Sequence, residues 1–350
     1  VDITSPDIPT LSDLMEHDAP RDLVARQEGT VICELDDLLA ASLTARDANA
    51  LRLLAPCDLQ AIKASGVTFA QSMVERVIEE RAGGKGALAQ DIRAKVASVI
   101  GDSLSGIKPG SPKAMQVKEL LLKEGLWSQY LEVGIGPDAE IFTKCPPMAA
   151  VGWGVEVGLH PISKWNNPEP EIVLAVNSKG KIQGASLGND VNLRDVEGRS
   201  ALLLGKAKDN NASCAIGPFV RLFDHTFTLD NIRVAELRLH VAGQDGFTLE
   251  GHSSMSQISR DPAELVQQTI GAHHQYPDGF MLFLGTMFAP VKDRDGENQG
   301  FTHHIGDRVQ ISEHGLGYLE NTVNLSTECA PWTFGVAGLM RNLAHRGLLK

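Results

Sequence analysis

The sequence has 350 residues, 43% of them hydrophobic, and a formal net charge of −12. This length and composition allow a sizeable buried core in one large domain or two unequal ones, and the acidic balance argues against a nucleic-acid binder. Five scattered cysteines without a C-x-x-C spacing predict reduced thiols, not a disulfide framework or a zinc site. No apolar run approaches the roughly 18 residues of a membrane span, and no signal-peptide pattern is found. The sequence therefore predicts a cytoplasmic protein without a membrane partner.

The first third of the chain is predicted to be mainly helical. Glu34–Asp47 and Asp58–Arg81 are typical of helices, the second interrupted near Gly66. Another helix is expected to begin at Ser111-Pro112, because serine is a common N-cap and proline suits the first helical position. We therefore expect residues 1–125 to form a mixed, largely helical N-terminal domain.

From about residue 140 the pattern changes to short strands and turns. Glu171–Asn177 and Lys181–Asn192 predict a hairpin, and Asp261–His274 predicts one helix that begins with a capping aspartate and a proline. Many short strands with few helices predict an α+β, mostly β, fold, in which residues 126–350 form a curled, antiparallel, barrel-like catalytic domain. Further strands are expected at Ser213–Leu222, Ile232–Val241, Phe247–Gly251, Gly279–Met287 and Asp307–Ile311.

Two glutamates separated by one residue stand at the start of the predicted hairpin. Glu169 and Glu171 share one face of a strand, because side-chain direction repeats every two residues. Two like charges so close together need a cation between them or a shared proton. Asp190 follows nineteen residues after Glu171, on the returning arm. Three carboxylates with room for water suit Mg²⁺ or Mn²⁺ better than zinc or copper. The alternative is a solvated strand edge with two ordinary glutamates.

Several motifs surround these carboxylates in a fixed order. They are Glu140-Ile141-Phe142-Thr143-Lys144-Cys145-Pro146-Pro147, Glu169-Pro170-Glu171, Asn189-Asp190-Val191-Asn192-Leu193-Arg194-Asp195, Lys208 ahead of Cys214-Ala215-Ile216-Gly217-Pro218, and Gly285-Thr286. The ordered set resembles the fumarylacetoacetate hydrolase superfamily, with its F-x-K-P-P, E-x-E, N-D-V-(S/T)-A-R-D and L-x-T-G-T segments. The resemblance spans about residues 66–349 and implies the fold of that family.

The resemblance also implies a role for each matching residue. The metal ligands become Glu169, Glu171 and Asp190, while Lys208 becomes a catalytic residue that relays protons. Chelation of a 2-keto acid by Mg²⁺ through its carboxylate and keto oxygens would stabilise the enolate formed when a C3 proton leaves. The residues that this resemblance places at the substrate are Arg194, Thr286 and Lys144.

The chain departs from the hydrolase members of the family between Gly66 and Glu75. Those members carry G-x-N-Y-x-x-H-x-x-E there, and their His-Glu pair activates the attacking water. Ser72 occupies the histidine position here, and a serine is no base at neutral pH without a partner. We expect Ser72 to contact the substrate and keep Glu75 as a catalytic candidate. The alternative is an amphipathic helix with a solvated Glu75.

The short step from Glu171 to Asp190, the overall length and the ending Pro331-Trp332-Thr333-Phe334 resemble bacterial 2-keto-3-deoxy-pentonate dehydratases. This resemblance implies Mg²⁺-dependent dehydration of such a sugar acid to 2,5-dioxopentanoate (α-ketoglutarate semialdehyde) in non-phosphorylative pentose catabolism. Glu140 is then the candidate acid for the leaving hydroxyl, or else a surface glutamate. A homodimer or homotetramer is the family expectation. Competing hypotheses are hydrolysis of an acylpyruvate or 2,4-diketo acid, and a metal-supported sugar-acid sensor.

Overall fold

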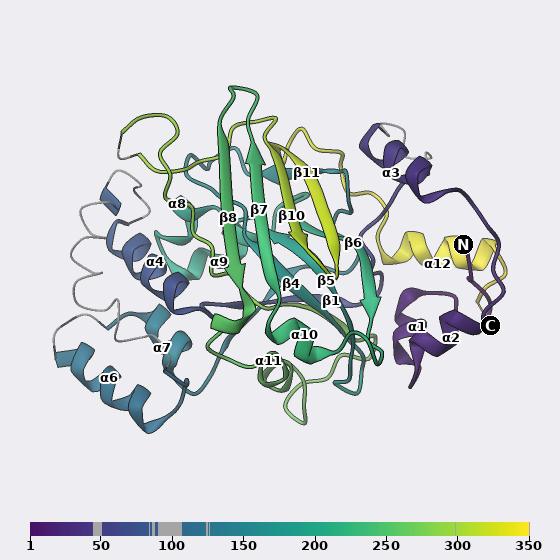
Figure 1. Cartoon of the computed structure of the whole chain (residues 1–350), viewed down its shortest axis with the longest axis horizontal. Helices are drawn as coiled ribbons and strands as arrows, with labels where there is room; N and C mark the ends of the chain where they lie inside the picture. Colours follow the sequence, from purple (N-terminus) through teal and green to yellow (C-terminus); the bar gives the residue numbers. More distant parts are fainter. Residues whose placement is uncertain are drawn as a thin grey trace.

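The structure is a computed structural model that describes residues 1–44, 51–83, 85, 88–89, 107–123, 125, 127–297 and 299–349. Its centre is a pair of β-sheets, one with six strands and one with five (Figure 1). The six-stranded sheet contains, in spatial order, β2 (Glu140–Cys145), β1 (Ala61–Gly66), β9 (Phe280–Phe283), β4 (Pro170–Val176), β5 (Ile182–Asp190) and β6 (Cys214–Leu222). The five-stranded sheet contains β3 (Glu156–Leu159), β11 (Gly317–Leu325), β10 (Arg308–Glu313), β7 (Glu236–Ala242) and β8 (Thr248–Ser254).

One apolar cluster joins the two sheets. Ile172 and Leu174 of β4 belong to the same buried group as Leu239 of β7, Ile311 of β10 and Leu319 of β11. Most neighbouring strands are antiparallel, as expected, but β1 runs parallel to β9 and β3 runs parallel to β11. The described strands therefore form a sandwich of two mixed sheets and not a closed barrel.

Helices lie at both ends of this sandwich (Figure 1). At one end are α4 (Ala70–Arg81), α6 (Pro112–Lys123) and α7 (Gln129–Ile135); at the other, near both termini, are α1 (Leu11–Glu16), α2 (Pro20–Arg26) and α12 (Val336–His345). Further helices in the described part of the chain are α3 (Leu35–Thr44), α8 (Arg194–Glu197), α9 (Leu204–Lys208), α10 (Leu229–Arg233), α11 (Pro262–Thr269), and the 3₁₀ turns Ala201–Leu203 and Met255–Gln257.

Several predicted elements are confirmed. The hairpin is β4 and β5, and α6 begins at Pro112 with Ser111 accepting a hydrogen bond from the Ala114 amide. Helix α11 begins after the Asp261 cap but ends at Thr269, five residues earlier than expected. The helix predicted over residues 34–47 is α3, and residues 45–47 lie outside the described part of the chain.

Two predicted elements are wrong. The first half of Asp58–Arg81 is strand β1, because Ala61–Gly66 pairs with both β2 and β9 and this pairing outweighs the helical propensity of its alanine and lysine residues. The start of the strand predicted at Ile232–Val241 is instead helix α10, and the strand begins at Glu236. Strand β1 comes from the predicted N-terminal domain but lies inside a sheet whose other strands come from residues after 125. The division of the chain into two domains at residue 125 stays a prediction.

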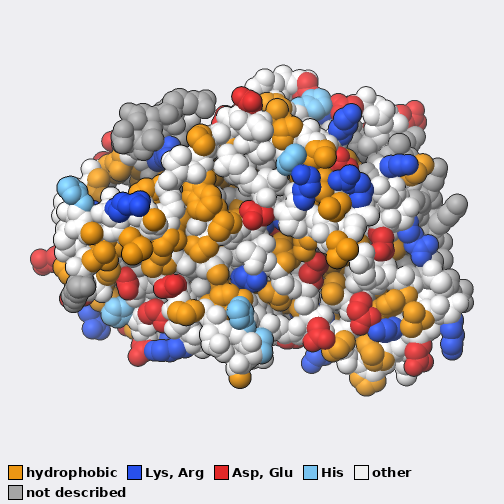
Figure 2. Space-filling view, turned by 180° about the vertical axis from the view of Figure 1, so that it is seen from behind, with side chains coloured by type: hydrophobic (Ala, Val, Ile, Leu, Met, Phe, Trp, Pro, Cys, Tyr) orange, Lys and Arg blue, Asp and Glu red, His pale blue; other side chains and the backbone are white. Residues whose placement is uncertain are grey.

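The described residues on the face opposite that of Figure 1 carry charges of both signs. Lysine and arginine side chains lie there among acidic and hydrophobic ones (Figure 2). Among the described helices, none combines the length and the apolar character that a membrane crossing needs.

Candidate metal and active site

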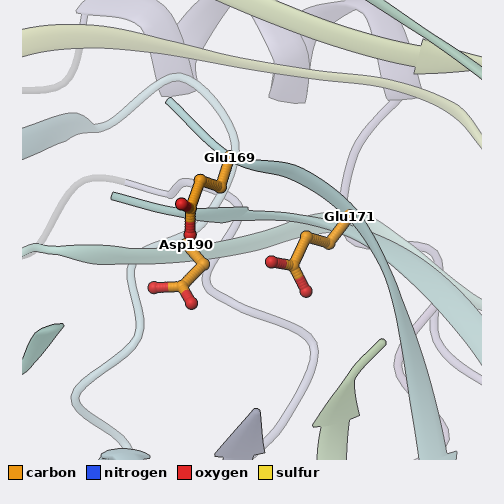
Figure 3. Close-up of side chains that lie close together, drawn as sticks. All are labelled: Glu169, Glu171 and Asp190. Carbon is orange, nitrogen blue, oxygen red and sulfur yellow. The ribbon is translucent and has the colours of Figure 1, made fainter. Parts of the chain in front are cut away.

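Three carboxylates converge at the paired ends of β4 and β5 (Figure 3). Glu169 precedes β4, Glu171 lies within it, and Asp190 ends β5, where its amide donates to the carbonyl of Glu169 at 3.0 Å. One oxygen from each carboxylate lies within 4.8 Å of the others, and all three residues are buried. The even spacing predicted for the two glutamates thus places them beside Asp190, as a divalent cation with oxygen ligands requires.

Each of the three carboxylates is oriented by its own donor. The Gly285 amide donates to Glu171 at 2.6 Å, and Arg76 Nη2 donates to Glu169 at 2.6 Å. Lys144 Nζ lies 2.9 Å from Asp190 Oδ1. Such outer contacts fix the direction of each ligand carboxylate.

Lys208 contacts two of the three carboxylates. Its Nζ lies 2.5 Å from Glu169 Oε2 and 3.1 Å from Asp190 Oδ2, and the residue is buried at the end of α9. Burial by itself would lower the pKa of Lys208, but the charges of Asp190 and Glu169 raise it above its usual value. The side chain of Lys208 therefore carries a positive charge next to the carboxylates.

The pKa values of the carboxylates are pushed apart by their surroundings. Burial, with the charges of Asp190 and Glu169, raises the pKa of Glu171 well above its ordinary value. Burial would also raise the pKa of Asp190, but Lys144 and Lys208 lower it. Burying a charge without an opposite partner is costly, so Glu171 is the carboxylate that gains most from a cation.

Arg76 on α4 is one of the cavity residues that the sequence analysis missed. Its guanidinium contacts Glu79 at 2.6 Å, Glu169 at 2.6 Å and Glu197 at 3.0 Å. Burial raises the pKa of Glu197 to about 7. The positions Ser72, Glu75, Arg76 and Glu79 recur at helical spacing, which is the one sequence signal that could have indicated this face of α4.

Arg194 reaches the same region but is already bonded by the protein. Its Nε contacts Glu79 at 2.6 Å, its Nη2 contacts Glu75 at 3.1 Å, and its Nη1 donates to the Pro290 carbonyl at 3.1 Å. The guanidinium also lies 4.2 Å from the centre of the Trp165 ring. The geometry favours a role in holding α4 against α8 over the predicted contact with substrate.

Ser72 lies in the first turn of α4. Its hydroxyl donates to the Phe69 carbonyl at 2.9 Å and accepts from the Phe69 amide at 3.3 Å. The hydroxyl therefore stabilises the helix start, and the position that is histidine in the hydrolases holds no base here.

Glu140 begins β2 and pairs with Gly66 of β1. A Cβ atom on Gly66 would stand 1.9 Å from Glu140 Oε2, so the missing side chain makes the space for this carboxylate. Burial raises the pKa of Glu140, which is the change that a proton donor needs. The predicted alternative, a surface glutamate, does not fit this position.

Thr286 follows Gly285, which has a φ of 90°. A Cβ there would lie 2.0 Å from Thr68 Oγ1, so glycine is required by both conformation and space. This bend carries the Gly285 amide to Glu171 and leaves Thr286 buried at the cavity wall.

One cavity gathers nine of the ten predicted site residues. They are Ser72, Glu75, Glu140, Glu169, Glu171, Asp190, Arg194, Lys208 and Thr286. The exception is Lys144, which is fully buried behind Asp190 and does not line the cavity. Its Nζ also faces the carbonyls of Lys208 and Val191. The predicted contact of Lys144 with substrate is thus not supported, and its position favours orienting Asp190.

The charge of the lining fits a divalent cation. Seven carboxylates and three cationic side chains line the cavity, and Lys144 adds one cation from behind. Oxygen-only ligands, an excess of negative charge and the high pKa of Glu171 agree with Mg²⁺ or Mn²⁺.

The fold and the site together define a family. The sequence model described as the C-terminal region of fumarylacetoacetate (FAA) hydrolase matches residues 126–324, more than half of the chain, and the chain belongs to this family. Its curated relatives include the 2-dehydro-3-deoxy-D-arabinonate dehydratase of Saccharolobus solfataricus, 29% identical over 180 residues. A probable 2-keto-3-deoxyxylonate dehydratase of Haloferax volcanii is 29% identical over 194 residues.

The matched region is a part of each relative. It covers 51% of this chain and 57% of the Saccharolobus protein, and 55% of this chain and 63% of the Haloferax protein. Among solved structures, 2-keto-3-deoxy-D-arabinonate dehydratase in its apo form has a TM-score of 0.60 at 22% identity. The same enzyme complexed with magnesium and 2,5-dioxopentanoate has a TM-score of 0.59 at 23% identity, and both cover 85% of this chain and 83% of the other. These structures share the fold.

Proposed function

We propose that this chain is a Mg²⁺-dependent dehydratase that converts a 2-keto-3-deoxy-pentonate to 2,5-dioxopentanoate. The observation that carries the proposal is one buried cavity that combines the carboxylates of Glu169, Glu171 and Asp190 with Lys208 and Glu140. The names of the two curated relatives, and the product and magnesium named for the solved enzyme, support the same assignment.

The metal would be held by Glu169, Glu171 and Asp190. Bound there, Mg²⁺ supplies a Lewis acid that polarises the keto group and makes the C3 proton more acidic. Arg76, Gly285 and Lys144 hold the three carboxylates in place through the contacts described above. Thr286, which follows Gly285 in the cavity wall, would bind the substrate carboxylate.

Lys208 and Glu140 would move the protons. Lys208 would take the C3 proton as a neutral amine, after its ammonium has passed a proton to one of the carboxylates that it contacts. The ammonium formed in this way then stabilises negative charge that develops on the substrate. Glu140, with its raised pKa, protonates the C4 hydroxyl, which leaves as water. Loss of a proton from C5 and gain of one at C3 turn the resulting alkene into an enol between C4 and C5. Loss of the enol hydroxyl proton and gain of a proton at C4 then give the C5 aldehyde, so the overall change is loss of one water.

The neighbourhood of Ser72 favours dehydration over carbon–carbon hydrolysis. Hydrolysis needs a base that activates water, and the described residues that line the cavity include no histidine. The remaining glutamate of the hydrolase pair, Glu75, contacts Arg194. Dehydration needs only an acidic C3 proton and help for a departing hydroxyl.

The deciding experiment is turnover of a panel of 2-keto-3-deoxy-pentonate epimers and acylpyruvates, with and without Mg²⁺. We expect Mg²⁺-dependent 2,5-dioxopentanoate from at least one epimer, and deuterium at C3 of the product in deuterated water. Splitting of acylpyruvates, with the sugar acids untouched, would assign the chain to hydrolysis instead. Binding of a sugar acid without turnover would indicate a sensor.

The assembly and the location are part of the same proposal. We infer a cytoplasmic homodimer or homotetramer that acts on a small 2-keto acid in pentose catabolism. Light scattering of the purified chain measures the assembly, and a monomer would contradict it.

A further inference from the structure

Asn167 extends the row of ligand carboxylates. It stands two residues before Glu169 and four before Glu171, so the three side chains leave the same face of an extended segment. The backbone of Asn167 is fixed by two hydrogen bonds of 3.1 Å with Asn192 on the neighbouring segment. Asn167 lines the cavity and is 2% exposed.

The amide of Asn167 presents an acceptor without a donor. Its Nδ2 donates to the Pro168 carbonyl at 2.9 Å, which fixes the orientation of the amide. Its Oδ1 has no hydrogen-bond partner within the described part of the protein. A buried acceptor without a donor costs free energy. Because Asn167 also lines the cavity, a molecule bound there can supply the donor.

Ser65 offers a second polar atom to the same cavity. It lies in β1 next to Gly66, whose bare Cα makes room for Glu140, and it is 3% exposed. Its Oγ also has no partner among the described residues, and it lines the cavity. Two residues that line the cavity of the carboxylates therefore each have a buried polar atom without a partner in the described part of the chain.

We propose that Asn167 Oδ1 accepts a hydrogen bond from the C5 hydroxyl of the substrate, with Ser65 Oγ as a second contact to the hydroxylated end. A carbonyl oxygen can pair only with a donor, so the carboxylate and the keto group of a 2-keto acid cannot satisfy Asn167. The C4 hydroxyl can also donate, but it is protonated and leaves as water, so a contact of Asn167 with it would not last through the reaction. The C5 hydroxyl remains as the donor.

This inference rests on the proposed dehydratase function and adds a reason for its specificity. A site with a buried acceptor discriminates against a substrate that lacks the matching hydroxyl, because the acceptor then stays unpaired. Asn167 and Ser65 are therefore assigned as the residues that select a polyhydroxy chain over a shorter or apolar one.

The test compares two substrates that differ only in the C5 hydroxyl. They are the preferred 2-keto-3-deoxy-pentonate and 4-hydroxy-2-oxopentanoate, which keeps the leaving hydroxyl at C4. The readout is the ratio of the two kcat/KM values, measured as substrate consumed. We expect Asn167→Ala to lower this ratio about tenfold, the typical effect of one lost hydrogen bond to a hydroxyl, and Ser65→Ala to lower it by a smaller factor.

Asn192→Ala is the matched control. Asn192 is fully buried and pairs with Asn167 through the backbone, but it does not line the cavity. A loss of folded protein in this region changes both substrates equally, so the control leaves the ratio unchanged. Asn167→Ser provides a second variant if Asn167→Ala does not fold, and thermal unfolding checks each protein.

The outcomes separate the inference from the proposed function. An unchanged ratio in the Asn167 and Ser65 variants, with the unaltered chain active on the pentonate, would overturn the inference and leave the dehydratase in place. Failure of the unaltered chain to dehydrate any pentonate epimer would overturn the proposed function, and the assignment of Asn167 with it. A ratio that falls only when Asn167 or Ser65 is changed supports both.

Discussion

The carboxylate of Glu140 occupies the space that a side chain on Gly66 would fill. The two residues are opposite each other on β2 and β1, and an added Cβ would stand 1.9 Å from Oε2. The absence of a side chain at Gly66 on β1 thus determines where the Glu140 carboxylate on β2 can lie.

Gly66→Ala is therefore expected to displace the Glu140 carboxylate without removing it. We expect the rate of dehydration to fall about 10²-fold, the lower range for loss of a general acid, while Mn²⁺ still binds. Steady-state kinetics and a Mn²⁺ titration measure the two effects. Gly205→Ala is the matched control, because nothing lies within 4 Å of its added Cβ. Equal rates in the two variants would remove Glu140 from the mechanism.

Glu171→Gln is expected to weaken metal binding and to stabilise the metal-free protein. Glu171 is buried against Glu169 and Asp190, and these surroundings raise its pKa, so a neutral isostere relieves repulsion. The Gly285 amide keeps an acceptor. We expect activity to be lost and metal affinity to fall by at least ~10-fold.

Glu169→Gln is the comparison for this experiment. It loses charged contacts with Arg76 and Lys208, so its metal-free form should unfold at a lower temperature than the unaltered chain. Thermal unfolding in chelator measures both variants. Full activity of the unaltered chain in excess chelator would refute the metal site.

Lys208→Met is expected to lower kcat by about 10²-fold or more with little change in KM, if the ammonium transfers a proton. Lys144→Met is the control, since Lys144 touches Asp190 from outside the cavity and should act through metal affinity. A change in KM alone for Lys208→Met would make Lys208 a binding residue.

Asp307→Asn is expected to destabilise the chain at neutral pH by about 3 kcal/mol, because it removes a buried partner of Arg294. Burial would raise the pKa of Asp307, but hydrogen bonds from Arg294 and His303 lower it below its ordinary value of 3.8. A carboxylate with a lowered pKa in the folded state contributes stability that is complete above pH 3.8 and is lost as the pH falls further. The difference in stability between the two proteins should therefore shrink below about pH 4. A difference that stays constant down to pH 2 would contradict this, and urea titrations at each pH measure it.

The ligand group was predictable from the sequence, whereas its supporting contacts were not. Glu169 and Glu171 follow the period of a strand, and the motif around Asp190 adds the third carboxylate. Arg76 and Glu79 look like an ordinary surface pair on a helix, since their spacing is that of neighbouring turns. The contact of Arg76 with Glu169 depends on how α4 packs against the sheet, and local sequence patterns do not contain that information.

Strand β1 was missed for a related reason. Its alanine and lysine residues favour a helix in isolation, and only the pairing with β2 and β9 makes this segment a strand. The unpaired state of Asn167 Oδ1 could not be predicted from the sequence either, because a missing hydrogen-bond partner is found only when all neighbouring residues have been placed.

The place of β1 has a consequence for how the chain acquires its structure. Ala61–Gly66 stands between β2 and β9, and its partner Phe280–Phe283 lies more than 200 residues further along the chain. Contacts of such high sequence separation slow folding. A fragment starting at residue 126 would leave β2 without its neighbour and one edge of β9 open, and open edges promote aggregation. We therefore expect the smallest soluble fragment with the catalytic cavity to include Ala61–Gly66.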